Sequence, residues 1–226
     1  MSASAASVDG LLAKERGAVV AFAKRMVRDR LVVGTSGNIS VRSADLVAVT
    51  PSGVDYDTMT ADDIPVVDLS GKVVRGALEP TTELPMHLAC YTKHGADAVV
   101  HTHGASATAV SLVCDEVPAV HYQLAMFGGS VRVAPYATYG TAELAANMSA
   151  ALQGRSGCLL RNHGTVTYGD TLGLAYDRSR QLEWLCQVWL MARTVGDPIL
   201  LSQEELDRVI AKFATHGQPQ LADPDR

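Results

Sequence analysis

Two histidines, His101 and His103, end the β-branched run ADAVVHTHG and are separated by one threonine. Residues two apart on a strand point to the same face of a sheet, so this pair could bind one metal ion. A third histidine, His163, lies in the motif RNHG beside another predicted strand end. Three neutral imidazoles with an open fourth position are typical of a catalytic Zn²⁺ site. A single histidine is more often a packed core residue, so this prediction depends on all three converging.

A carboxylate accompanies these histidines in the motif EPTTELP, where Glu83 follows a Thr pair at the predicted start of a helix. A carboxylate can bind zinc and also act as a base, and we interpret Glu83 as the fourth member of the set. Taken alone, a glutamate in a first helical turn is explained by its favourable interaction with the helix dipole. His87, one turn further along, is interpreted as a packing or supporting residue rather than a ligand.

Three other segments combine glycine with hydroxyl side chains: GTSGN at residues 34–38, TPSG at residues 50–53, and the pair Thr81 and Thr82. Backbone N–H groups at turns and helix starts bind phosphate without a lysine or arginine. None of the three carries the G-K-[ST] ending of a nucleotide-binding P-loop. Each alone has the composition of an ordinary turn, and together they predict a neutral site for an anion.

The elements that position these residues alternate imperfectly between helix and strand. Helical patterns run over residues 10–30, 81–95, 105–113, 141–152 and 171–196, and β-rich runs over residues 31–42, 46–53, 66–76, 96–104 and 156–169. Several of the β-rich runs resemble hairpins, which favours a mixed sheet flanked by helices over a purely parallel one.

The composition favours one domain. With 226 residues and 47% hydrophobic residues, the chain can bury a single substantial core, which we assign to residues 11–226. Residues 1–10 are small and polar and are predicted to form a disordered tail. Residues 202–226 are predicted to be a C-terminal helix and tail, opened by a capping box of Ser202 and Glu205.

The net charge excludes some partners. A formal charge of −5 gives no basic field for nucleic acid, and an anionic substrate must therefore be held by local donors. No apolar run is long enough to span a membrane and the start does not resemble a signal peptide, so we expect a cytoplasmic protein without a membrane partner. The four scattered cysteines are predicted to be buried: Cys90, Cys114, Cys158 and Cys186.

Six motifs resemble, in order and spacing, the class II aldolase and adducin family. They are S-G-N-I-S, T-P-S-G, E-P-T-T-E, V-V-H-T-H-G, P-Y-A-T-Y-G-T and L-L-R-N-H-G, and the resemblance covers about residues 11 to 195. It implies a three-layer α/β/α fold with a mixed, mostly antiparallel sheet. It also implies a ring-shaped homotetramer with active sites at the subunit interfaces.

The resemblance also implies roles for individual residues. The zinc ligands fall on Glu83, His101, His103 and His163, with Glu83 as the catalytic acid–base group. The phosphate-binding residues fall on Gly37, Asn38, Ser52, Gly53, Thr81 and Thr82. The Thr pair stands where the family has two serines, and its extra methyl groups narrow the pocket. The active-site tyrosine, contributed by a neighbouring subunit, falls on Tyr122, for which packing at an interface is the alternative. No tyrosine follows Tyr176, so we expect the tail not to complete the pocket as it does in relatives.

The implied activity is the reversible, metal-dependent cleavage of a ketose 1-phosphate to dihydroxyacetone phosphate and an aldehyde. L-Fuculose 1-phosphate and 5-deoxypentulose 1-phosphates are the expected kinds of substrate, and Zn²⁺ is expected over Mn²⁺ or Co²⁺. A sugar-phosphate dehydratase, a 4-epimerase and an unphosphorylated substrate are alternatives. Glu83 disfavours the epimerase, which has aspartate there, and the full ligand set disfavours a non-catalytic scaffold.

Overall fold

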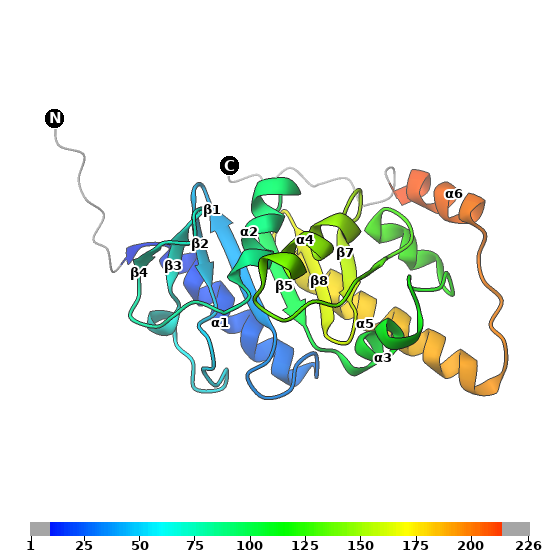
Figure 1. Ribbon diagram of the computed structural model, residues 1–226, viewed down its shortest axis with the longest axis horizontal. Helices are drawn as coiled ribbons and strands as arrows, with labels where there is room; N and C mark the ends of the chain where they lie inside the picture. The colour runs from blue at the N-terminus through cyan, green and yellow to red at the C-terminus, as the bar shows by residue number, and fades with distance from the viewer. Residues whose placement is uncertain (1–9, 214–226) are drawn as a thin grey trace, which may run out of the picture.

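An eight-stranded mixed sheet forms the centre of the computed structural model, which describes residues 10–213 (Figure 1). The strand order is β4-β3-β2-β1-β5-β8-β7-β6, and every neighbouring pair is antiparallel except β6 and β7. The strands are β1 (Asn38–Ser43), β2 (Leu46–Val49), β3 (Val66–Asp68), β4 (Val73–Arg75), β5 (Ala98–Thr102), β6 (Val133–Ala134), β7 (Gly157–Leu160) and β8 (Gly164–Gly169). The predicted mixed, mostly antiparallel sheet is confirmed.

Helices cover both faces of this sheet (Figure 1). They are α1 (Ala13–Arg28), α2 (Leu84–Lys93), α3 (Ala105–Val113), α4 (Ala142–Ala151), α5 (Leu172–Val195) and α6 (Gln203–Phe213), with short 3₁₀ helices η2 (Ala61–Asp63) and η3 (Tyr122–Phe127). The alternation of side chains along β5 explains the two layers. Val99 packs into a cluster with residues of α2 and α4, whereas Val100 packs on the other face with residues of α1 and α5.

Local sequence signals account for the ends of these helices. Thr141 and Thr171 precede α4 and α5, and each side-chain oxygen accepts a hydrogen bond from the backbone N–H three residues on. Ser202 does the same for Glu205 at the start of α6. The helices and the 66–76 hairpin predicted from the sequence are all present, with ends shifted by a few residues.

The structure also bears on the predictions about the tails, membranes and cysteines. Residues 1–9 and 214–226, which hold most of the predicted tails, lie outside the described residues. Within residues 10–213, no helix combines the length and apolarity needed to cross a bilayer. Three of the four cysteines are buried as predicted, but Cys114 is partly exposed because it lies at the C-terminal end of α3.

Candidate metal centre and its pocket

Four side chains from three regions of the fold converge on one point. His101 lies in β5 and His103 just after it, while His163 lies in the turn between β7 and β8. Because β8 pairs with β5 in an antiparallel register, this turn stands beside the end of β5. Glu83 is the residue immediately before α2. The four possible ligand atoms all lie within 4.8 Å of one another.

The imidazole nitrogens of this cluster face each other and the carboxylate. The Nε2 atom of His101 lies 2.9 Å from Glu83 Oε2 and 2.9 Å from His103 Nε2. The Nε2 atom of His163 lies 3.3 Å from Glu83 Oε1. On the opposite side of its ring, His101 Nδ1 lies 2.8 Å from the carbonyl oxygen of Thr165. Since a carbonyl only accepts, Nδ1 carries the proton, and the Nε2 lone pair of a neutral His101 points into the cluster.

Burial and the neighbouring charges together determine the charge of these groups. Burial lowers the pKa of His103 to about 3, with a further contribution from His101, and lowers the pKa of His163 to about 4. Both rings are therefore neutral near pH 7, the form that binds metal. Burial alone would raise the pKa of Glu83, but His101 and Asn38 outweigh it and hold that pKa below its usual value. The same carboxylate outweighs burial at His101 and raises the pKa of that ring.

These observations fit a divalent cation. Several lone pairs face one another at hydrogen-bond distance, an arrangement that is repulsive unless a proton or a cation lies among them. The buried Glu83 Oε1 atom has no hydrogen-bond partner among the described residues. Three imidazole nitrogens and one carboxylate oxygen form a donor set typical of Zn²⁺, and the Thr165 carbonyl gives His101 the supporting hydrogen bond that zinc-binding histidines usually have.

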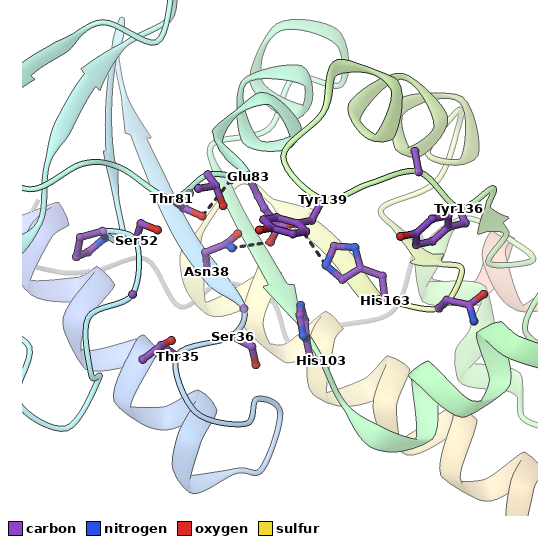
Figure 2. A pocket seen from close by; sticks show the side chains of 16 residues that line it. Thr35, Ser36, Asn38, Ser52, Thr81, Glu83, His103, Tyr136, Tyr139 and His163 are labelled. Atoms are coloured by element: carbon purple, nitrogen blue, oxygen red, sulfur yellow. Dashed lines mark hydrogen bonds and ion pairs between the residues drawn. The ribbon is translucent and has the colours of Figure 1, made fainter.

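A cavity of about 320 Å³ opens onto the centre (Figure 2). Figure 2 shows Thr81, Asn38 and Ser52 to one side of Glu83, with His163 and Tyr136 to the other. All six residues to which the family resemblance assigns phosphate binding line this cavity: Gly37, Asn38, Ser52, Gly53, Thr81 and Thr82. The described lining contains neither lysine nor arginine, so an anion bound here would rely on neutral donors.

The side chains of two of those six residues are already engaged with other groups. The Nδ2 atom of Asn38 donates to Glu83 Oε2 at 2.9 Å, and its Oδ1 atom lies 2.6 Å from His87 Nε2. Thr81 Oγ1 accepts a hydrogen bond from the Glu83 backbone N–H at 3.2 Å. Ser52 and Thr82 are exposed in the cavity, which makes their hydroxyls the freer donors.

Tyr122 stands apart from this cavity. It is the first residue of η3, is about half exposed, and has its ring 6.3 Å from that of Phe213 in α6. It does not line the cavity of its own chain, so its role in catalysis stays a prediction that needs a neighbouring subunit.

Sequence reasoning missed three polar residues that line the cavity: Tyr136, Tyr139 and Asn162. The two tyrosines lie between β6 and α4 with more than half of their surface exposed. They belong to the motif PYATYGT, which signalled the family but suggested no role for either ring. Asn162 adopts a left-handed backbone (φ 57°) immediately before His163. The available signal in the sequence was an asparagine next to the histidine of the motif RNHG.

Comparison with known proteins agrees with this geometry. The family model described as Class II Aldolase and Adducin N-terminal domain matches residues 17–190. The chain is 37% identical over 211 residues to 5-deoxy-D-ribulose 1-phosphate aldolase of Bacillus thuringiensis serovar kurstaki, covering 92% of this chain and 99% of that protein. It is 40% identical over 195 residues to L-fuculose phosphate aldolase of Escherichia coli K12, covering 85% and 90%. A solved structure of L-fuculose 1-phosphate aldolase superposes with a TM-score of 0.85 at 37% identity, covering 89% of this chain and 96% of that one.

Proposed function

We propose that this chain, which belongs to the class II aldolase and adducin family, is a metal-dependent aldolase that acts on a ketose 1-phosphate. The products of cleavage are dihydroxyacetone phosphate and an aldehyde. The observation that carries the proposal is the position of three of the four ligand side chains in the wall of a cavity that is otherwise rich in neutral donors. The relatives named above are named for two ketose phosphates, which supports this substrate class.

The resident metal is proposed to be Zn²⁺, held by Glu83, His101, His103 and His163. When bound, it would supply Lewis-acid stabilisation of negative charge on the oxygens of the substrate, worth several kcal/mol. The neutral state of His103 and His163 leaves both Nε2 atoms available for the metal near pH 7. Metal analysis of the protein as purified would distinguish Zn²⁺ from Mn²⁺ and Co²⁺.

Glu83 is proposed to move the proton at the donor carbon. In the direction of synthesis it takes a proton from the carbon of dihydroxyacetone phosphate that becomes nucleophilic, and in cleavage it returns one there. Its Oε2 atom accepts a hydrogen bond from Asn38, whereas its buried Oε1 atom has no hydrogen bond among the described residues. Oε1 is therefore the atom proposed to carry the proton.

The wall of hydroxyls and glycines is proposed to hold the phosphate. Ser52 and Thr82 would donate from their hydroxyls, while Gly37 and Gly53 allow the backbone to approach closely. Binding energy from the phosphate would then orient the C3–C4 bond beside Glu83. At the other end of the substrate, Tyr122 of a neighbouring subunit is proposed to exchange a proton with the aldehyde oxygen, within a homotetramer.

The deciding experiment is a cleavage assay on a panel of ketose 1-phosphates, with dihydroxyacetone phosphate detected in the presence and absence of a chelator. Release that the chelator abolishes, strongest with L-fuculose 1-phosphate or a 5-deoxypentulose 1-phosphate, is expected. Absence of release from every member, with metal bound, would refute the aldolase assignment. The same protein would then be assayed for dehydration and 4-epimerisation of pentulose phosphates.

A further inference from the structure

Five side chains form a continuous buried chain of hydrogen bonds that runs from the metal centre into the core. It begins at Glu83 Oε2, which accepts from Asn38 Nδ2 at 2.9 Å, and continues from Asn38 Oδ1 to His87 Nε2 at 2.6 Å. His87 Nδ1 lies 2.5 Å from Ser40 Oγ, which lies 2.5 Å from the hydroxyl of Tyr91. All five residues are buried; Asn38 and Ser40 lie in strand β1, Glu83 immediately precedes helix α2, and His87 and Tyr91 lie one and two turns into that helix.

The chemistry of each group determines which atom donates in every hydrogen bond of this series. An ionised carboxylate only accepts, so Asn38 must present its NH₂ group to Glu83 and its carbonyl oxygen to His87. His87 Nε2 must then donate. Burial lowers the pKa of His87 to about 3, so the ring is neutral and its Nδ1 accepts from the Ser40 hydroxyl. Ser40 Oγ has then donated its only hydrogen to His87. In its contact with Tyr91 it therefore accepts a hydrogen bond from the tyrosine hydroxyl.

His87 supports this orientation of the Asn38 amide from the side opposite Glu83. An asparagine amide can be rotated to exchange its oxygen and nitrogen with little change of shape, and only its partners choose between the two orientations. With His87 donating, the reversed amide would face Glu83 with an oxygen and His87 with an NH₂ group, giving two mismatched contacts. The Nε2–H tautomer of His87 thus helps to keep a donor aimed at Glu83 Oε2, while Oε1 has no hydrogen bond among the described residues and lies 3.3 Å from His163 Nε2.

We propose that His87 is a positioning residue for the reaction, acting on Glu83 through the amide of Asn38. It keeps Glu83 Oε2 in the hydrogen bond with Asn38 and leaves Oε1 to bind the metal and to carry the proton. This role rests on the proposed function where the proton transfer is concerned. The hydrogen-bond directions do not depend on that function, and they can be tested separately.

The first test is the tautomer of His87 in the full-length protein labelled with ¹⁵N-histidine. Long-range ¹H–¹⁵N spectra at pH 7, with and without Zn²⁺, are expected to show a neutral ring protonated on Nε2. The His87 signals are assigned by their absence from the spectrum of His87→Gln. A ring protonated on Nδ1, or on both nitrogens, would overturn the proposal whether or not the protein cleaves any sugar phosphate.

The second test compares two substitutions at His87. His87→Gln retains an N–H donor near the position of Nε2, whereas His87→Leu has a similar volume and no donor. We expect the Zn²⁺ dissociation constant to rise about tenfold in His87→Leu and to return close to the parent value in His87→Gln. With saturating Zn²⁺, proton exchange at the donor carbon should fall in His87→Leu while KM changes little, because the cavity wall is intact.

Two controls separate positioning from a general loss of structure. Tyr91→Phe removes the most distant donor and is expected to change Zn²⁺ affinity less than His87→Leu. Thermal unfolding of each variant reports its stability. Equal losses of Zn²⁺ affinity in the Leu and Gln variants would refute the role of His87, as would losses that simply follow the unfolding temperature. If no sugar phosphate is cleaved, the Zn²⁺ affinities and the tautomer still decide the proposal.

Discussion

His101 Nδ1 lies 2.8 Å from the carbonyl oxygen of Thr165, on the strand that pairs with its own. This contact fixes the ring so that its other nitrogen faces Glu83 and His103. The centre is therefore held by the register of two central strands as well as by side-chain packing. One register step between β5 and β8 would turn His101 to the opposite face of the sheet.

Removing one ligand should empty the centre without unfolding the protein. His103 follows β5 and its side chain is only partly buried, so His103→Ala leaves the sheet intact. We expect this variant to lose most of its Zn²⁺ and its activity, measured by elemental analysis and the cleavage assay, while its circular dichroism stays unchanged. His121→Ala, away from the cavity, is the matched control and should retain its Zn²⁺. Full Zn²⁺ occupancy in His103→Ala would contradict the ligand assignment.

Glu83→Gln tests the base directly. Glutamine has nearly the same shape and can still offer one oxygen to the metal, but it cannot take up a proton near pH 7. We expect partial retention of Zn²⁺ and a loss of proton exchange at the donor carbon of roughly a hundredfold or more. Exchange followed by NMR in deuterated water makes the measurement. Near-normal exchange would remove Glu83 from this role, and the exposed Glu79→Gln should behave as the parent does.

The sequence allowed the fold and the metal centre to be predicted for different reasons. Strand and helix periods, with turn residues between them, were enough to predict a mixed sheet flanked by helices. The ligand set depended on residue types at strand ends, and those positions converge because β5 and β8 are neighbours. That adjacency is a property of the whole topology, which local periodicity does not contain.

The parts that were missed depend on contacts between distant segments. The phosphate role that the family resemblance implies for Asn38 stays a prediction, but the contacts of its amide with Glu83 and His87, 45 and 49 residues away, were not foreseen. His87 was assigned a packing or supporting role, with no partner named, because nothing in the sequence indicates what a buried histidine contacts. Cys114 was predicted to be buried from its apolar neighbours, yet the end of α3 leaves it partly exposed.

The phosphate site can be tested with the two exposed hydroxyls that line it. Ser52→Ala and Thr82→Ala should each raise KM for a ketose 1-phosphate several-fold, with a smaller change in kcat. The reason is that the lost hydrogen bond stabilises the bound substrate and the transition state to a similar extent. The unphosphorylated ketose provides the internal control, since its turnover should not respond to either substitution. An equal effect on both substrates would show that these hydroxyls contact another part of the sugar.

A carboxylate on α5 should stabilise the segment that follows His103. Glu183 accepts hydrogen bonds from the backbone N–H groups of Ser106 and Ala107, at 2.8 and 2.9 Å, at the start of α3. This contact supplies the cap that Gly104, at the N-cap position, lacks. Glu183→Ala should lower the free energy of unfolding by about 1–2 kcal/mol, as loss of an N-cap does. Denaturant unfolding measures this, and an unchanged midpoint would refute the capping role.

Alanine substitutions at two glycines of one loop distinguish the cost of a strained backbone from the cost of a steric clash. Gly34 and Gly37 both have positive φ, at 61° and 73°, so alanine at either position carries the strain of a left-handed backbone, about 1 kcal/mol. A Cβ at Gly34 meets nothing within 4 Å, whereas one at Gly37 would lie 2.5 Å from Val32 Cγ1 and 2.8 Å from the carbonyl oxygen of His101.

Gly37→Ala should therefore cost clearly more than Gly34→Ala in the free energy of unfolding, by about 2 kcal/mol or more, because the added methyl group displaces backbone as well as a side chain. It should also weaken Zn²⁺ binding, since the displaced carbonyl belongs to a ligand. Urea unfolding and Zn²⁺ titration of both variants make the comparison. Equal costs at the two positions would mean that the loop relaxes away from β5, and Gly37 would then be explained by its backbone angle alone.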